Sequence, residues 1–190
     1  MKRTEQKEKR RQQILNVGLD LFILNGYAAT RTIDIAKAVG MSEGLLFHYF
    51  ATKEKLYLEL IEIALSGREN SFRFSDAEPL VFFETVAEYI ISTCADDNFN
   101  AKLFVLMAHA ENSVLLPEEL RKNISGRQEM DETAKLIRQG QKDGSIKKGD
   151  PLALASVFWA SVHGVVENMA RNPGLTVPNP SWIVDILRKI

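Results

Sequence analysis

The sequence predicts an all-α protein in which an N-terminal three-helix module of the helix-turn-helix type is joined by a linking helix to a larger helical domain. Three observations predict this fold class. Apolar residues recur three and four positions apart over most of the 190 residues, as on the buried face of a helix. No segment shows the alternation of apolar and polar residues that is typical of strands. Glycine and proline residues fall between the periodic segments, where helices end or begin.

The composition is that of a soluble chain. A hydrophobic fraction of 45% can fill a core, and 26% charged residues suit a solvated surface. The single cysteine, Cys94, excludes an intrachain disulfide and does not suggest an oxidising compartment. The N-terminus is basic and polar, unlike a signal peptide, and the longest uncharged run, Pro151–Val166, is too short to span a bilayer. We therefore expect a cytoplasmic protein with no membrane partner.

The charge is unevenly distributed along the chain. Residues 1–60 carry ten Lys and Arg against seven Asp and Glu, whereas residues 61–190 carry fourteen against eighteen. Six of the ten basic residues lie within the first eleven positions. This asymmetry is typical of an N-terminal segment that meets a polyanion, although a solvated basic helix end would give the same pattern.

The first expected helix covers residues 4–25, and its apolar face includes Gly18, where a neighbouring helix can approach closely. This helix is predicted to end at the turn signal Asn25-Gly26. The other apolar residues of the face are Ile14, Val17, Leu21 and Phe22.

Two short helices are expected within Thr30–Phe50. The first ends at Gly40, because glycine adopts the left-handed conformation without a steric clash. Ser42 is predicted to cap the second, Glu43–Tyr49. A tight turn between two short helices is typical of a DNA-binding helix-turn-helix, although an ordinary helical corner would give the same local pattern. The apolar positions of the two helices are Ile33, Ala36, Val39 and Leu46.

Thr52 is a cap signal for a linking helix that begins at Lys53 and runs to about Leu65 or beyond. We therefore divide the chain into an N-terminal module, residues 1–52, and a larger helical domain, residues 53–190. Residues 66–79 show no clear pattern. The remaining expected helices are Pro79–Cys94, Ala101–Glu111, a segment from Pro117 to Gly140–Gly144, Leu152–Arg171 and Ser181–Ile190.

The run Gly26–Leu56, GYAATRTIDIAKAVGMSEGLLFHYFATKEKL, resembles the signature of the tetracycline-repressor (TetR) family. The shared features are a Gly-aromatic turn, a Thr-rich helix start, Ile-Ala, Gly-x-Ser, Tyr-Phe and Lys-x-x-Leu in this order. Farther along, residues 144–166 resemble the family's run into its penultimate helix. The resemblance implies a dimeric, all-helical transcription factor, usually a repressor. In such a protein residues 1–52 would bind DNA, and residues 53–190 would bind a small ligand and form the dimer.

The resemblance also implies which residues contact DNA. Glu43, Gly44 and Phe47 match positions that face bases. The positions near phosphates are matched by Thr32, Leu45, His48, Tyr49 and Lys53. With residues at the starts of the two helices added, the predicted DNA-contacting set is Thr30, Arg31, Thr32, Ser42, Glu43, Gly44, Leu45, Phe47, His48, Tyr49 and Lys53.

Elementary physics supports several of these roles. Lys53 would place a charge at a helix N-terminus, where backbone N–H groups also favour a phosphate. The Tyr49 hydroxyl can donate to a phosphate oxygen, and Gly44 lets the helix backbone approach DNA closely. Arg31 and the basic N-terminal tail are further candidates for phosphate or minor-groove contact, although the tail could equally be disordered.

Some positions depart from the family pattern. Leu45 stands where a threonine is common, so no hydroxyl reaches a phosphate there. Phe47 stands where tyrosine is usual, which leaves apolar contact with a thymine methyl group. Arg31 stands where Ser or Thr often caps the helix, so Thr30 is expected to supply the cap. Glu43 could accept from a cytosine amino group, or it could face solvent clear of the phosphates.

Aromatic and apolar residues of the larger domain are the candidates for a ligand pocket between helices, since pockets in helical bundles are mostly apolar with a few polar groups. We expect a lipophilic or aromatic effector, although each residue taken singly could instead be ordinary core. The predicted ligand-binding set is Phe82, Phe83, Tyr89, Phe104, Met107, His109, Glu111, Asn112, Phe158, Trp159 and His163.

Small and apolar residues share a stripe on the last two expected helices. Small side chains let another helix come close, so we predict a two-fold interface in which these helices of both subunits form a four-helix bundle. The alternative is that they complete the core of the monomer. The residues are Val157, Ala160, Ser161, Gly164, Val165, Trp182, Ile183, Ile186 and Leu187.

No set of residues points to catalysis, and we expect no enzyme activity, metal or cofactor. His163 and Glu167 are four positions apart, as metal ligands on one helix can be, but no third ligand is evident. The sequence contains neither a Gly-rich phosphate loop nor a nucleophile elbow.

The sequence therefore predicts a ligand-responsive transcriptional regulator, most simply a repressor. It would bind palindromic double-stranded DNA as a homodimer and be released by a small, largely apolar effector. The alternative is a helical small-molecule-binding or catalytic protein whose N-terminal module only resembles a DNA-binding one.

Overall fold

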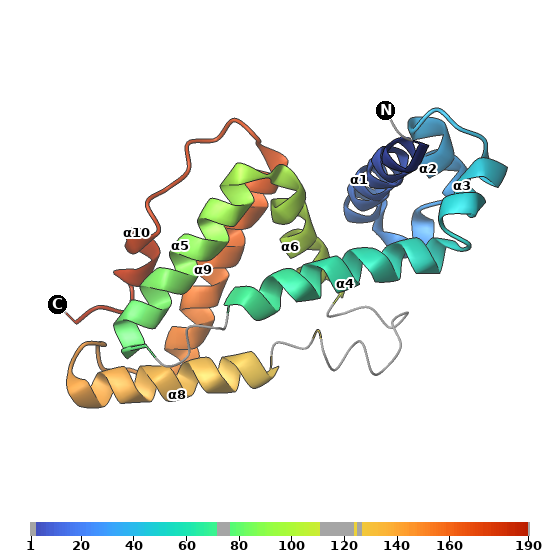
Figure 1. Cartoon of the computed structure of the whole chain (residues 1–190). Helices are drawn as coiled ribbons and strands as arrows, with labels where there is room; N and C mark the ends of the chain where they lie inside the picture. The colour runs from blue at the N-terminus through green and yellow to red at the C-terminus, as the bar shows by residue number, and fades with distance from the viewer. Residues whose placement is uncertain (1–2, 72–76, 111–123, 125–126, 190) are drawn as a thin grey trace. The chain divides into compact units, whose positions relative to one another are not determined.

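The computed structural model describes residues 3–71, 77–110, 124 and 127–189, and the described residues fold almost entirely into helices (Figure 1). The chain forms two compact units, Met1–Leu65 and Ser66–Ile190. The first unit contains the start of the linking helix, whereas the sequence led us to divide the chain at residue 53. The predicted all-α fold class is confirmed.

The first unit is built from three helices and the beginning of a fourth. These helices are α1 (Arg3–Ala29), α2 (Thr32–Ala38), α3 (Glu43–Tyr49) and α4 (Lys53–Ser71). Gly18 lets α4 come close to α1, because a Cβ at this position would lie 3.0 Å from the Leu56 side chain. An ion pair between Arg11 and Glu59 joins the same two helices. The predicted close approach at Gly18 is therefore confirmed.

The α1 helix continues past its predicted end. Gly26 has a φ angle of 76° inside α1, so the chain kinks there and then resumes a helical path to Ala29. The turn signal at Asn25-Gly26 marks this kink rather than the end of the helix. In α2 Ala36 is buried as predicted, and Ile35 is buried as well, whereas Ile33 is exposed and Val39 is only partly buried.

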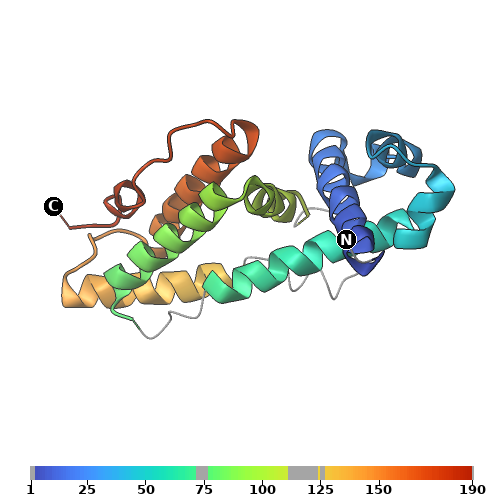
Figure 2. The ribbon, with the colours of Figure 1, turned by 45° about the horizontal axis from the view of Figure 1, so that its top comes forward.

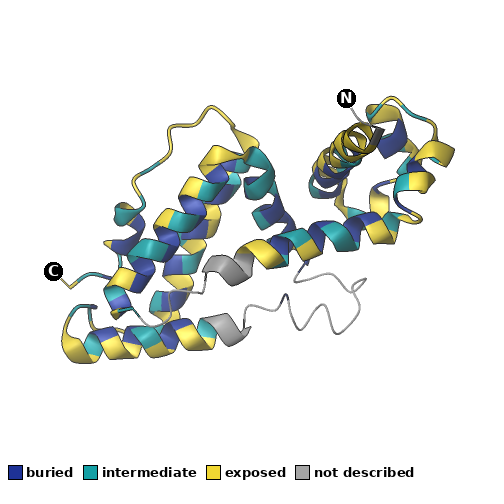
Figure 3. Cartoon of the chain, viewed as in Figure 1, coloured by how far each residue is buried: buried dark blue, intermediate teal, exposed yellow. Residues whose placement is uncertain are grey.

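The second unit packs around α9 (Pro151–Arg171), which contacts α5 (Pro79–Asp96), α6 (Asn98–Ala110) and α8 (Arg127–Asp143). Helices α5 and α9 lie side by side in both views (Figures 1 and 2). Their shared core includes edge-to-face contacts of Phe83 with Phe82 and with Phe158, at centroid distances of 5.4 Å and 4.9 Å. Buried positions run along the inner faces of these helices, with exposed positions on their outer faces (Figure 3).

Local start signals were reliable in this unit. Proline stands in the first turn of α5, as predicted, and also in the first turn of α9, because a missing N–H has no cost there. The Asp150 carboxylate caps α9 by accepting from the Ala153 N–H at 2.8 Å. The predicted start at Pro117 and the residue Glu111 lie outside the described residues.

The last helix is much shorter than predicted. We expected Ser181–Ile190, but α10 covers only Ser181–Val184. Beyond it the chain turns and becomes extended, so that the Leu187 carbonyl accepts from the Lys147 N–H at 2.9 Å. Pairing with this distant segment satisfies backbone groups that a longer helix would have satisfied internally.

Among the described residues, no helix is long and apolar enough to cross a membrane.

Candidate nucleic-acid interface

The α3 helix has only seven residues, and three local features hold it in place. Gly40 ends the preceding turn with a φ angle of 68°, in the left-handed region. The Ser42 hydroxyl accepts from the Leu45 N–H at 3.2 Å, which caps α3 as predicted. Leu46, with an exposed fraction of 1%, anchors the helix in the unit. Each feature was predicted from the local sequence.

The opposite side of α3 is open to solvent and carries apolar side chains. Leu45 and Phe47 are exposed to 44% and 43%. Gly44 is also exposed, and a Cβ built there would meet nothing within 4 Å. Packing within the chain therefore does not require a glycine at this position, whereas close approach by an outside partner would.

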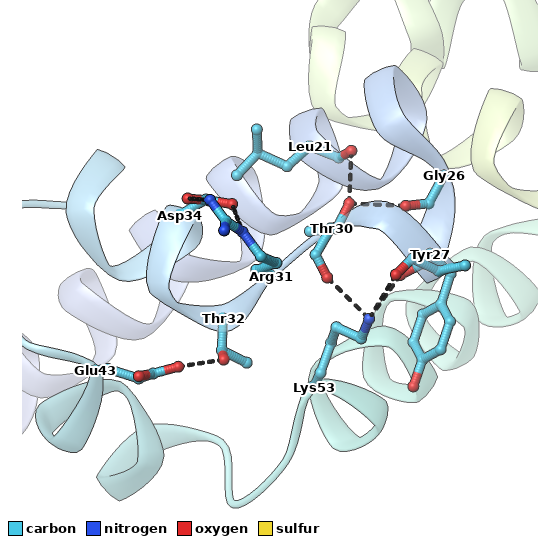
Figure 4. Close-up of polar contacts among 10 residues, drawn as sticks. Leu21, Gly26, Tyr27, Thr30, Arg31, Thr32, Asp34, Glu43 and Lys53 are labelled. Carbon is cyan, nitrogen blue, oxygen red and sulfur yellow. Dashed lines mark hydrogen bonds and ion pairs between the residues drawn. The ribbon is translucent and has the colours of Figure 1, made fainter.

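Glu43 is engaged within the module, since the Thr32 hydroxyl donates to its carboxylate (Figure 4). This contact joins α2 to the first turn of α3. The structure thus gives Glu43 a partner that neither sequence interpretation had supplied, because the two residues are eleven positions apart. Contact of Glu43 with a base stays a prediction.

Arg31 is exposed, and its guanidinium pairs with Asp34 through Nε–Oδ2 and Nη2–Oδ1 contacts of 2.7 Å and 2.9 Å. The hydrogen bond from Arg31 lowers the pKa of the Asp34 carboxyl. A contact between Arg31 and a phosphate would have to share or break this pair.

The prediction for Thr30 is corrected by the structure. Thr30 is 2% exposed, and its hydroxyl donates to the Leu21 and Gly26 carbonyls at 3.0 Å and 2.8 Å (Figure 4). It therefore stabilises the kinked end of α1 and has no surface to offer to DNA. It does not cap α2 either, because Arg31 occupies that position and provides no side-chain cap.

Lys53 also lies differently from the prediction. Its Nζ donates to the Tyr27 and Thr30 carbonyls at 2.7 Å and 2.8 Å, and to the Ala28 carbonyl at 3.5 Å (Figure 4). The ammonium also lies 4.4 Å from the centroid of the Tyr27 ring. An ammonium group has three donors, and here all three have acceptors within the chain. Lys53 thus caps the carbonyl end of α1 instead of projecting toward solvent.

The structure leaves the remaining predicted DNA-contacting residues accessible. Ser42 and His48 are exposed, and Tyr49 and Thr32 are half-buried. Together with the open side of α3 they make up the candidate surface on the first unit.

The predicted ligand-binding residues differ in how far they are buried. Some are fully part of the core of the second unit, and these are Phe82, Phe83 and Phe158. Others are partly buried against the same core, and these are Tyr89, Phe104 and Trp159. The centroid of the His163 ring lies 4.6 Å from that of Phe104, and Met107 is buried, whereas His109 and His163 are exposed. Asn112 and Glu111 lie outside the described residues.

The described residues contain no cluster of three or more His, Cys, Asp or Glu side chains that could hold a metal ion. Glu167, the possible partner of His163, pairs with Arg171. Cys94 is buried, and burial raises the pKa of its thiol to about 12, so the reactive thiolate is scarce at neutral pH.

Comparison with known proteins agrees with this geometry. Residues 14–60 match the family of bacterial regulatory proteins described as the tetR family. The chain is 29% identical over 164 residues to the HTH-type transcriptional regulator RutR of Escherichia coli K12, covering 84% of this chain and 75% of RutR. It is 47% identical over 63 residues to the regulator QacR of Staphylococcus aureus Mu50, covering 33% of this chain and 34% of QacR.

The fold agrees over nearly the whole chain with a solved structure, that of AibR in complex with isovaleryl coenzyme A and operator DNA. The TM-score is 0.65 at 22% identity, covering 93% of this chain and 94% of AibR. The match at residues 14–60 falls on the helices that carry the candidate surface. Residues 14–60 of this chain therefore belong to the tetR family of bacterial regulatory proteins, and the likeness to RutR and QacR supports a DNA-binding transcriptional regulator.

Proposed function

We propose that the protein is a repressor that binds a palindromic operator as a homodimer and leaves it when a small, largely apolar effector binds. The observation that carries this proposal is the open side of α3. A short capped helix anchored by Leu46 presents Gly44, Leu45 and Phe47 to solvent, in the manner of a helix that enters a major groove. Two such helices in a dimer would contact half-sites about 34–36 Å apart, or a multiple of this distance.

The dimer is supported by an exposed apolar face on the second unit. Val157 on α9 is 51% exposed and Trp182 on α10 is 66% exposed. Ala160 and Gly164 follow Val157 along the exposed face of α9 and have small side chains. Ile183 and Leu187, which we had included in the stripe, are buried in the monomer and do not belong to this surface.

Two observations support the proposal of an apolar effector. The aromatic side chains of the second unit lie where helical bundles hold apolar ligands, and AibR, which has a similar fold, is known in complex with isovaleryl coenzyme A. The effector would release the operator only to the extent that it binds the DNA-free conformation more tightly than the DNA-bound one.

A mobility shift of the full chain with the DNA upstream of its own gene tests the proposal. We expect a specific complex at low micromolar concentration or below, and no complex on any DNA would favour the alternative of a small-molecule-binding protein.

Phe47→Ala tests the role of α3 in the same assay. Loss of apolar contact with bases should weaken operator binding by about 1–3 kcal/mol, which is roughly fivefold to 150-fold, and leave binding to random DNA nearly unchanged. Leu152→Ala on α9, an apolar residue of similar exposure, is the control and should bind like the unmodified protein. Equal losses on operator and random DNA would remove Phe47 from base contact.

A further inference from the structure

A groove of about 770 Å³ runs between the N-terminal part of α1 and the α3 helix. Both walls belong to the first unit. The α1 wall consists of Gln6, Lys7, Lys9, Arg10 and Gln13, and the α3 wall consists of Leu45, His48 and Tyr49. We refer to it as the α1–α3 groove.

The α1–α3 groove is strongly basic. Lys7, Lys9 and Arg10 are all exposed, and no carboxylate occurs among the lining residues that the structure describes. The α1 wall spans residues 6–13, so its charges and amides extend over about 10 Å of helix. Cations spread along a helix suit an extended polyanion, whereas a compact anion would need donors that converge on one point.

Arg10 shows that the groove is organised by the fold. Its Nη1 donates to the Gln13 side chain at 3.1 Å and to the Val39 carbonyl at 3.3 Å. Val39 is the C-cap residue that follows α2, so Arg10 connects α1 to the helix-turn-helix. The basic wall is therefore held at a defined place beside α3.

We infer that the α1–α3 groove binds the sugar-phosphate backbone of DNA next to the major groove that α3 enters, so that α1 forms part of the DNA interface. The inference rests on the proposed function, because it requires α3 to contact the duplex. Leu45, His48 and Tyr49 belong to α3 and also line the groove, so a strand that borders α3 passes this wall. Lys7, Lys9 and Arg10 then neutralise phosphates, and the glutamine amides donate to phosphate oxygens.

These contacts are independent of base sequence and have a distinct signature. The slope of log K against log salt concentration is negative, and each phosphate neutralised adds about 0.9 to its magnitude. The groove therefore contributes a defined share of the salt dependence of binding, and it contributes equally on operator and on random DNA.

The test is a triple variant, Lys7→Ala, Lys9→Ala and Arg10→Ala, titrated with operator and random DNA between about 50 and 200 mM salt. We expect the salt slope to fall by about 2 to 3 per subunit, and affinity to fall by the same factor on both DNAs. A second variant, Lys7→Gln with Lys9→Gln, leaves Arg10 and its contacts within the fold intact. The magnitude of its salt slope should fall by about 2 per subunit.

A matched control removes the same charge from the second unit. Lys135→Ala, Arg138→Ala and Lys142→Ala change three exposed positions of α8, and the slope should stay at the value of the unmodified protein. Thermal unfolding of each variant, monitored by circular dichroism, shows whether the first unit remains folded.

The outcomes separate this inference from the proposed function. If the unmodified protein binds DNA and both groove variants keep its salt slope, the groove inference is overturned and the function stands. If the groove variants lose affinity with the slope unchanged, the residues act on folding alone and the inference is again overturned. If the unmodified protein binds no DNA, both proposals fail together.

Discussion

Lys53 shows how one side chain can serve the fold at a place where a DNA contact was expected. Its ammonium group bonds to three carbonyls at the end of α1, beyond the kink at Gly26 where the helix loses its regular pattern. A positive charge is favourable at this carbonyl end because of the helix dipole. Lys53 is the first residue of α4, so its hydrogen bonds connect the start of that helix to the end of α1.

Lys53→Met tests this role. The substitution keeps most of the apolar stem and removes the charge-assisted hydrogen bonds. The free energy of unfolding, measured by urea denaturation, should therefore fall by about 2 kcal/mol. The salt slope of DNA binding should stay unchanged, because no phosphate contact is lost.

Lys55→Met is the control for this measurement, since Lys55 is exposed on the same helix. Its stability should change by less than about 0.5 kcal/mol. An unchanged stability for Lys53→Met together with a slope reduced by about 0.9 would restore the phosphate contact implied by the family resemblance.

At the scale of the element, α3 depends on its ends. A helix of seven residues does not form by itself in water, because nucleation costs more than so few hydrogen bonds return. The Ser42 cap, the left-handed Gly40 and the buried Leu46 compensate for this. All three features act within a few residues, so the sequence predicted both ends of α3 correctly.

Ser42→Ala should therefore destabilise the protein by about 1 kcal/mol, because the Leu45 N–H loses its acceptor. The measurement is the free energy of unfolding in urea, monitored by circular dichroism. Ser42→Asn keeps a capping side chain and should lie within a few tenths of a kcal/mol of the unmodified protein. Equal destabilisation by both substitutions would show that the cap is not what stabilises α3.

At the scale of the whole molecule, the proposed dimer depends on a face of α9 that the monomer leaves open. Gly164 is exposed and has helical geometry, and a Cβ there would meet nothing within 4 Å of its own chain. A large side chain at this position is thus compatible with the fold of the subunit and would disturb only a partner that packs against it.

Gly164→Trp is accordingly expected to convert a dimer to monomers of 21.4 kDa in light scattering, with the unfolding temperature of the subunit nearly unchanged. Gly67→Trp on α4 is the matched control, since Gly67 is also exposed with nothing within 4 Å of a Cβ, and it should leave the mass unaltered. A dimeric Gly164→Trp protein would place the interface elsewhere.

By itself the sequence determined the all-α class, most helix starts, both ends of α3, and the surface that DNA is proposed to meet. These depend on caps, left-handed glycines, first-turn prolines and apolar periodicity, whose physical causes lie within one or two helical turns. The match to the TetR signature falls on the same local features.

Only the tertiary structure decided which side chains are engaged in contacts within the chain. Thr30 and Lys53 are bound to the end of α1, Glu43 is held by Thr32, and α10 ends early because the chain pairs with residues near Lys147. The partners in these contacts come from different elements, up to about forty residues apart. Hydrogen bonds and burial depend on distance in space, and no local pattern in the sequence records which remote group will satisfy a donor or cover an apolar face.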